Sequence, residues 1–205
     1  MKIVLLGDSI RQQYGKNMGE LLGDGFEVFQ PEDNCRFAKY LLRMLFDYES
    51  DMRGASIAHF NCGHWDLNNL FGDGPLTSLE EYGENVLRIA KILLSRHEKV
   101  IFATTTPTGP ENKYNKNDVI ISFNEYIVPK LKEIGVIIND LHSLVYSDID
   151  RYIRSDTLHL SDEGVEICAK ATAEIIKREA SSLEQRADLP ADAPKSEGIG
   201  YSVLL

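Results

Sequence analysis

Short runs of apolar residues alternate along the chain with longer segments in which apolar positions recur every three or four residues. The short runs predict buried strands at residues 3–6, 26–29, 57–60, 100–104 and 136–138. Strands that alternate with helices favour a parallel sheet that is covered by helices on both faces. The pattern therefore predicts an α/β fold with three layers.

The segments between these strands carry the apolar stripes of amphipathic helices. Such stripes run over residues 37–45, 79–93 and 120–134. A last helix is expected after Ser161, and the second stripe is preceded by Thr77-x-x-Glu80, a spacing typical of a capping box. Pro129 predicts a kink or a boundary in the third helix, because proline has no backbone N–H to donate.

Polar residues follow the ends of three predicted strands. Asp8 and Ser9 follow the first strand, residues 34–36 follow the second, and residues 61–66 follow the third. Ligands of open parallel sheets bind beyond the carboxyl ends of the strands. The topology therefore predicts that these residues converge on one site.

Length and composition favour one globular domain with a short extension. The chain has 205 residues, of which 43% are hydrophobic and 26% are charged. We expect the domain to span residues 1–180, because residues 181–205 shift toward Ser, Ala, Asp and Pro. Apolar residues recur at 199–205, which predicts that the extension packs on this subunit or on a second copy in a homo-oligomer.

Charge and hydropathy exclude several classes of partner. The formal net charge of −10 and the absence of a Lys/Arg cluster argue against nucleic-acid binding. No apolar run reaches membrane-spanning length, and no secretory signal pattern is present. Cys35, Cys62 and Cys168 lack the spacing of a zinc site, so we expect reduced thiols, no metal and a cytoplasmic protein.

Three residues have the chemistry of a hydrolase triad. Ser9 follows the first strand, and Asp156 and His159 lie three positions apart just before the last helix. A serine needs a base to take its proton, and the histidine needs a carboxylate to fix its tautomer. The alternatives are that Ser9 caps a helix, that Asp156 forms a turn and that His159 is a surface residue.

The motifs Gly7-Asp8-Ser9-Ile10 and Asp156-x-x-His159 resemble the first and last blocks of the SGNH, or GDSL-type, hydrolases. The resemblance extends over residues 2–178 through the order of strands and motifs. It implies a flavodoxin-like α/β/α fold with a five-stranded parallel sheet, and ester hydrolysis without a cofactor. It also implies that Ser9, His159 and Asp156 are the catalytic residues.

The two middle blocks depart from the family pattern. The second block of the family supplies a glycine N–H to the oxyanion hole, whereas this chain offers Asn34-Cys35-Arg36. We expect the N–H of Cys35 or of a neighbour to take that place beside the N–H of Ser9. In the third block a tryptophan replaces the usual asparagine, so Asn61 is the expected side-chain donor. This block resembles a carbohydrate-esterase-like subset of the family.

Other residues near these blocks are candidates for substrate binding. Gly63, His64 and Trp65 could line the cleft, and packing within the loop is the alternative for His64 and Trp65. Asp8 is also a candidate, although it could hold the turn, or accept a phosphoryl group or a metal in a different class of protein. Arg36 is expected either to contact an anionic substrate group or to face solvent.

Three further residues are expected to have structural roles. We expect Arg11 in solvent, with contact to an anionic substrate group as the alternative. We expect Asp66 to tie down its loop, and His59 to be a buried or edge histidine of the sheet. None of these expectations bears on the reaction directly.

The sequence thus predicts a serine esterase for short acyl groups, with an acetyl ester of a carbohydrate or another small molecule as substrate. A thioesterase or lysophospholipase of the same family is one alternative, since it would use the same catalytic residues. A flavodoxin-like binding or receiver module with Asp8 as its acid is the other.

Overall fold

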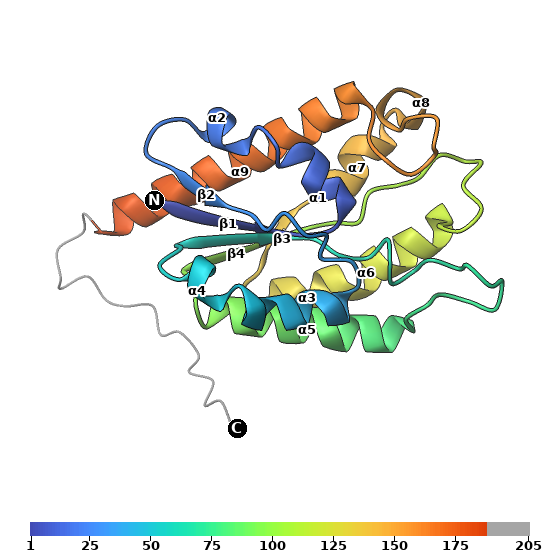
Figure 1. Ribbon diagram of the computed structural model, residues 1–205, viewed down its shortest axis with the longest axis horizontal. Coiled ribbons are helices and arrows are strands. Elements are labelled where there is room, and N and C mark those ends of the chain that lie inside the picture. Colours follow the sequence, from blue (N-terminus) through green and yellow to red (C-terminus); the bar gives the residue numbers. More distant parts are fainter. Residues whose placement is uncertain (188–205) are drawn as a thin grey trace.

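The computed structural model describes residues 1–187 and contains one parallel sheet in the order β2-β1-β3-β4-β5 (Figure 1). The strands are β1 (Lys2–Leu6), β2 (Glu27–Phe29), β3 (Ile57–Phe60), β4 (Lys99–Ala103) and β5 (Ile137–Asn139). The order reverses between β1 and β3, whose paired residues include Ile3 with Ile57 and Leu6 with Phe60. The predicted flavodoxin-like α/β fold is therefore confirmed, with its topological switch point between β1 and β3.

Helices cover both faces of the sheet, which Figure 1 shows nearly edge-on. One face carries α1 (Ser9–Tyr14), α2 (Met18–Leu22), α7 (Leu141–Tyr146), α8 (Ile149–Tyr152) and α9 (Asp162–Ala187). The other face carries α3 (Ala38–Asp47), α4 (Glu49–Met52), α5 (Leu79–Leu94) and α6 (Asn117–Glu133). The sequence pattern predicts the long helices but misses α2, α4, α7 and α8, because one or two turns are too short for an apolar stripe.

Each strand contributes to two hydrophobic cores. In β1, Val4 and Leu6 point to the core beneath α3, α5 and α6, whereas Ile3 and Leu5 point to the core beneath α1, α2, α7 and α9. This alternation follows from the period of two along a strand. All four side chains are fully buried, which is why the strand reads as a continuous apolar run.

Two local helix signals are placed differently from the prediction. The cap of α5 is Ser78, whose Oγ accepts from the N–H of Glu81, so the predicted box at Thr77 and Glu80 is wrong by one residue. Pro129 lies inside α6, which continues to Glu133. Of the two predicted effects of this proline, the boundary is therefore wrong, and the kink stays a prediction.

The last helix runs further than the composition suggests. The helix α9 ends at Ala187, beyond the predicted domain boundary at residue 180. Leu183, in its last part, still packs against the hydrophobic core that α9 shares with α1, α2 and α7. The predicted anchoring of the apolar residues at 199–205 lies outside the described residues. It stays a prediction.

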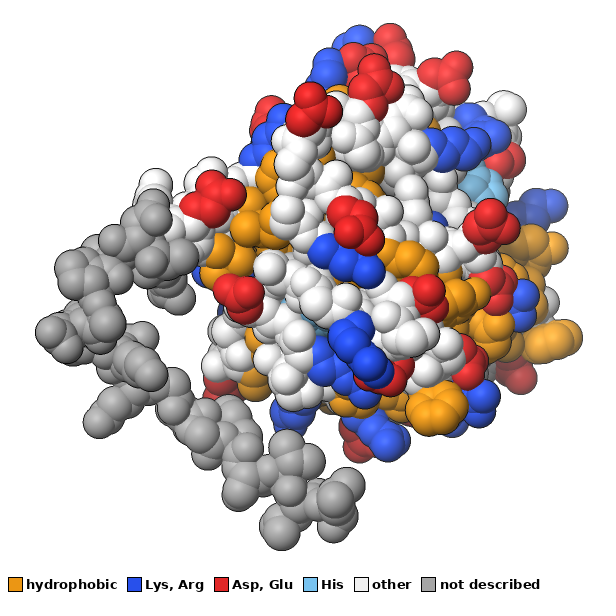
Figure 2. All heavy atoms as spheres, turned by 60° about the vertical axis from the view of Figure 1, so that its left-hand side comes forward, with side chains coloured by type: hydrophobic (Ala, Val, Ile, Leu, Met, Phe, Trp, Pro, Cys, Tyr) orange, Lys and Arg blue, Asp and Glu red, His pale blue; other side chains and the backbone are white. Residues whose placement is uncertain are grey.

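Charged side chains of both signs are interspersed on the face shown in Figure 2. Surface ion pairs among residues 1–187 include Lys39 with Glu81 and Arg43 with Asp47. Among residues 1–187, no helix combines the length and hydropathy that crossing a membrane requires.

Candidate active site

The turn from β1 into α1 presents Ser9 at the carboxyl edge of a central strand. Asp8 caps α1, because its Oδ1 accepts from the N–H of Ile10 at 3.0 Å. Gly7 has a φ of +157°, and a Cβ at this position would lie 1.8 Å from Oδ1 of Asn61. Only glycine lets the turn pass so close to the end of β3. The helix cap is thus Asp8, and the alternative reading of Ser9 as the cap is wrong.

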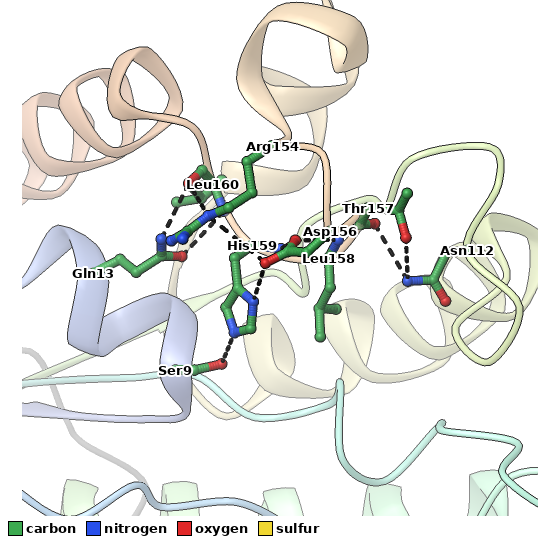
Figure 3. A network of polar contacts seen from close by, with 9 residues as sticks. All are labelled: Ser9, Gln13, Asn112, Arg154, Asp156, Thr157, Leu158, His159 and Leu160. Atoms are coloured by element: carbon green, nitrogen blue, oxygen red, sulfur yellow. Dashed lines mark hydrogen bonds and ion pairs between the residues drawn. The ribbon is translucent and has the colours of Figure 1, made fainter.

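Ser9, His159 and Asp156 form a continuous hydrogen-bonded chain (Figure 3). Nε2 of His159 lies 3.0 Å from Oγ of Ser9, and Nδ1 lies 2.9 Å from Oδ2 of Asp156. The carboxylate can only accept, so it fixes the proton on Nδ1 and leaves Nε2 free to accept from the hydroxyl. This is the geometry that nucleophile activation requires.

The turn around Asp156 keeps its carboxylate charged. Its Oδ1 accepts from the backbone N–H of Leu158 at 2.9 Å and of His159 at 2.8 Å. Desolvation is the largest single influence and raises the pKa of Asp156, but these two N–H groups and the His159 side chain together outweigh it. The pKa therefore lies below its ordinary value, and Asp156 is ionised at neutral pH.

Asn61 lies directly behind the Ser9 turn. It follows β3, is 4% exposed, and donates from Nδ2 to Oδ1 of Asp8 at 2.9 Å. An amide nitrogen carries two hydrogens, so the second remains for another acceptor. Ser9 is the first residue of α1, whose N–H stands outside the intrahelical bonds, and no partner for it is found among residues 1–187.

The expectation for Cys35 is not met. Its N–H donates to the carbonyl of Gly7 at 3.0 Å, and its Sγ accepts from the N–H of Gly7 at 3.2 Å. Both groups therefore fasten the loop after β2 to the Ser9 turn, so the N–H of Cys35 is not free for an oxyanion. The next residue, Arg36, has a φ of +46°, the conformation that favours glycine. Its N–H donates to Oδ1 of Asn34 at 2.8 Å.

Gly63 and His64 pack within the loop after β3. A Cβ on Gly63 would lie 2.2 Å from Oγ1 of Thr105, so this position requires glycine. His64 is 4% exposed, and its Nδ1 faces Nδ2 of Asn115 at 3.1 Å. The amide donates, so the proton is on Nε2, which lies 3.0 Å from Oγ1 of Thr106. Burial lowers the pKa of His64, so the imidazole is neutral at neutral pH. Its contacts favour the packing alternative, and its role in lining the cleft stays a prediction.

Asp8 is also withdrawn from the surface. It has no exposed area, and its Oδ1 is occupied by Ile10 and Asn61. It therefore cannot contact a substrate or accept a phosphoryl group without a rearrangement of the turn. Its role in holding the turn agrees with the alternative that the sequence left open.

Trp65 and Arg36 remain accessible. Trp65 is 39% exposed and packs edge-on against Phe37, with 5.6 Å between ring centroids. The Arg36 guanidinium lies 4.8 Å from the centre of the Tyr40 ring and 3.6 Å from Asp33. Their roles in substrate binding stay predictions.

Arg11 is buried, which corrects the expectation of a solvent-exposed side chain. It donates to the carbonyls of Pro31 at 3.0 Å, Gly7 at 3.2 Å and Asp33 at 3.1 Å. Its guanidinium therefore ties the Ser9 turn to the loop after β2. A single arginine in a polar sequence context gives no signal of this burial.

Asp66 and His59 have the structural roles that were expected. Both carboxylate oxygens of Asp66 lie within 3.2 Å of the N–H of Ala38, the first residue of α3. Burial raises the pKa of Asp66 to about 7 despite this hydrogen bond. His59 is fully buried, its Nε2 lies 3.1 Å from Nδ2 of Asn139, and burial lowers its pKa to about 3.

Two further residues that sequence reasoning missed hold the segment around His159. Gln13 contacts Leu160 and Asn112 contacts Thr157 (Figure 3). Gln13 lies four positions after Ser9 on the same helix, so its place on the same face was a usable signal. Asn112 lies in a polar loop that contains several asparagines, and nothing in the sequence distinguishes it.

The protein has the SGNH hydrolase fold. The features that define this fold are the strand order, the Ser9 turn after β1 and the Asp156–His159 turn before α9. No protein-family model matches the chain. The resemblance to the SGNH hydrolases is nevertheless confirmed by the proteins to which the chain is similar.

Three solved structures illustrate the likeness. The acetyl xylan esterase AlAXEase superposes with a TM-score of 0.71 at 20% identity, over 86% of this chain and 100% of that one. A GDSL-like lipase from Bacteroides thetaiotaomicron superposes with a TM-score of 0.71 at 15% identity, over 87% and 88%. Axe2, an acetylxylan esterase from Geobacillus stearothermophilus, superposes with a TM-score of 0.67 at 14% identity, over 84% and 92%.

Among curated proteins, the GDSL esterase/lipase WDL1 from Oryza sativa subsp. japonica is 28% identical over 160 residues. The alignment covers 70% of this chain and 62% of the relative. The chain therefore matches less than two thirds of the length of this relative.

Proposed function

We propose that the protein is a serine-dependent carboxylic ester hydrolase with Ser9, His159 and Asp156 as its catalytic residues. The observation that carries the proposal is the pair of contacts from one imidazole, 3.0 Å to the Ser9 hydroxyl and 2.9 Å to the Asp156 carboxylate. The similarity to a GDSL esterase/lipase gives independent support.

The geometry supports a two-step reaction. Oγ of Ser9 attacks the ester carbonyl while Nε2 of His159 takes its proton. Collapse of the tetrahedral intermediate breaks the bond to the alcohol, which leaves with the proton from His159. Water then attacks the acyl-enzyme by the same route and releases the acid and Ser9. Asp156 holds the tautomer of His159 and stabilises the imidazolium.

Two groups are available to stabilise the negative oxygen of each intermediate. These are the backbone N–H of Ser9 and the second N–H of Asn61 Nδ2. Donors that are fixed in place before the reaction stabilise the developing charge without reorganisation. The burial of Asn61 and its bond to Asp8 supply that fixation.

A short acyl group, with acetyl as the first choice, is the substrate class that we assign. The third block, with Asn61, Gly63 and Trp65, resembles the carbohydrate-esterase-like subset. Two of the solved structures with this fold, AlAXEase and Axe2, are acetyl xylan esterases. The exposed Trp65 ring could pack on a sugar. This support comes from analogy.

A longer acyl group is the second candidate. Leu70, Phe71 and Leu76 follow the third block and are 49%, 79% and 39% exposed. Such side chains would favour an apolar chain on the substrate. Initial rates on p-nitrophenyl esters from acetyl to octanoyl separate the two, since a preference for octanoyl would overturn the short-chain assignment.

The first experiment is hydrolysis of p-nitrophenyl acetate by the wild type and by Ser9→Ala. Turnover is expected to fall by about 10³-fold or more in the variant. Ser95→Ala is the matched control, because Ser95 caps the far end of α5 and should leave the rate unchanged. Equal turnover in wild type and Ser9→Ala, with both folded by circular dichroism, would refute the proposed nucleophile.

A further inference from the structure

Thr157 has an unfavourable backbone conformation next to the proposed catalytic base. Its φ is +66°, and within residues 1–187 only Arg36 shares a positive φ among non-glycine residues. A β-branched side chain crowds the backbone in this region, so the conformation persists only where neighbours hold it. Thr157 lies between Asp156 and Leu158 in the turn that carries His159 (Figure 3).

The loop between β4 and α6 supplies the neighbours that hold Thr157. The carbonyl of Thr157 accepts from the N–H of Gly109 at 2.8 Å and from Nδ2 of Asn112 at 3.3 Å. The same Nδ2 lies 3.2 Å from Oγ1 of Thr157. Asn112 therefore contacts both the backbone and the side chain of the strained residue.

The amide of Asn112 is itself fixed. Its Oδ1 accepts from the N–H of Tyr114 at 3.0 Å and of Asn115 at 2.8 Å, which leaves Nδ2 to face Thr157. Asn115 is held in turn by two contacts to His64. Asn112 is 8% exposed, so its contacts are protected from water. The donor that holds Thr157 is thus part of a rigid network.

The left-handed residue sets the direction of the chain that follows it. Beyond Thr157, the N–H groups of Leu158 and His159 turn back to Oδ1 of Asp156. These bonds orient the carboxylate whose Oδ2 contacts His159. If Thr157 relaxed to the α or β region, the two N–H groups would turn away from Asp156.

We propose that Asn112 is a positioning residue for the Asp156–His159 pair, which it fixes by holding Thr157 in its left-handed conformation. This inference rests on the proposed function. Asn112 does not touch the reacting atoms, so its loss should affect turnover more than substrate binding.

The central experiment is a comparison of Asn112→Ala in two backgrounds. In the wild type, Asn112→Ala is expected to lower kcat on p-nitrophenyl acetate by about tenfold, with KM within about twofold. Asn117→Ala is the control, since Asn117 braces Thr108 in the same loop. It should leave kcat unchanged.

Thr157→Gly provides the second background. Glycine adopts a φ of +66° without strain, so the segment no longer depends on Asn112. Adding Asn112→Ala to Thr157→Gly should therefore cost less than about threefold in kcat. An equal loss in both backgrounds would overturn the proposal. Asn112→Ser is a companion variant, because its hydroxyl can keep the loop turn but cannot reach Thr157.

A readout without substrate separates this inference from the proposed function. The proton between His159 Nδ1 and Asp156 should give a downfield proton NMR signal, which Asn112→Ala should shift or broaden and Asn117→Ala should not. An unchanged signal in Asn112→Ala would overturn the positioning role. Failure of Ser9→Ala to reduce turnover would instead refute the proposed function, and the NMR comparison would still test Asn112.

Discussion

Gln13 and the backbone of Leu160 exchange two hydrogen bonds, each 3.1 Å long, between α1 and the segment that carries His159. The Gln13 amide donates to the Leu160 carbonyl and accepts from the Leu160 N–H. Gln13 lies one helical turn after Ser9, and Leu160 directly follows His159 (Figure 3). The pair therefore links the two parts of the chain that supply the hydroxyl and the imidazole, although 147 positions separate them.

Replacing Gln13 by alanine should loosen this link. Substitution leaves the Leu160 backbone without its partner on α1, so the distance between Ser9 and His159 should vary more. We expect kcat on p-nitrophenyl acetate to fall by about tenfold with little change in KM. Gln12→Ala is the matched control, because Gln12 lies on the same helix but donates instead to the carbonyl of Glu32 in an exposed hydrogen bond. Equal rates for the two variants would contradict the role of Gln13.

Asn61 should contribute to turnover rather than to binding. Asn61→Ala removes the proposed side-chain donor to the oxyanion, and loss of one such donor costs about 10²–10³-fold in kcat. KM should change much less, because the charge develops only in the transition state. Steady-state kinetics, with melting temperatures to check the bond to Asp8, test this expectation. A variant with normal kcat and raised KM would exclude Asn61 from the oxyanion hole.

Arg11 should matter for stability. Arg11→Ala leaves three buried carbonyl contacts without their charged donor, so the free energy of unfolding should fall by about 2–4 kcal/mol. Urea denaturation measures this change. Arg43→Ala is the comparison, since Arg43 is exposed, where it pairs with Asp47 and lies over the Phe46 ring. Its loss should have a much smaller effect. Similar losses for the two variants would contradict the importance of the buried contacts.

Asp66 should make stability depend on pH near neutrality. Its pKa is about 7 in the folded protein and 3.8 ordinarily, so the folded state binds the proton more tightly. Stability should therefore fall as pH rises from about 4 to about 7, by a few kcal/mol at most. Asp66→Asn removes this titration, so the melting temperature of the wild type minus that of the variant should decrease over this range. Parallel curves would show that Asp66 does not titrate there.

The sequence by itself determined the framework of the fold and the main chemistry of the candidate site. Buried strands read as apolar runs because burial on both faces leaves no polar positions, as at Val4 and Leu5. A parallel sheet then brings its carboxyl ends together, so Ser9 and Asn61 had to lie near one another. The short spacing of Asp156 and His159 likewise follows from local geometry. The structure brings all four into one neighbourhood.

Only the tertiary structure decided how the supporting groups are used. The N–H of Cys35 donates to the carbonyl of Gly7. Arg11 is buried and donates to backbone carbonyls, and the amide of Asn112 donates to the carbonyl of Thr157. Hydrophobic burial repeats with the period of a helix or strand, so it is visible along the chain. The partner of a polar group depends instead on which distant segment lies within about 3 Å of it. That distance is fixed only when the whole chain has packed.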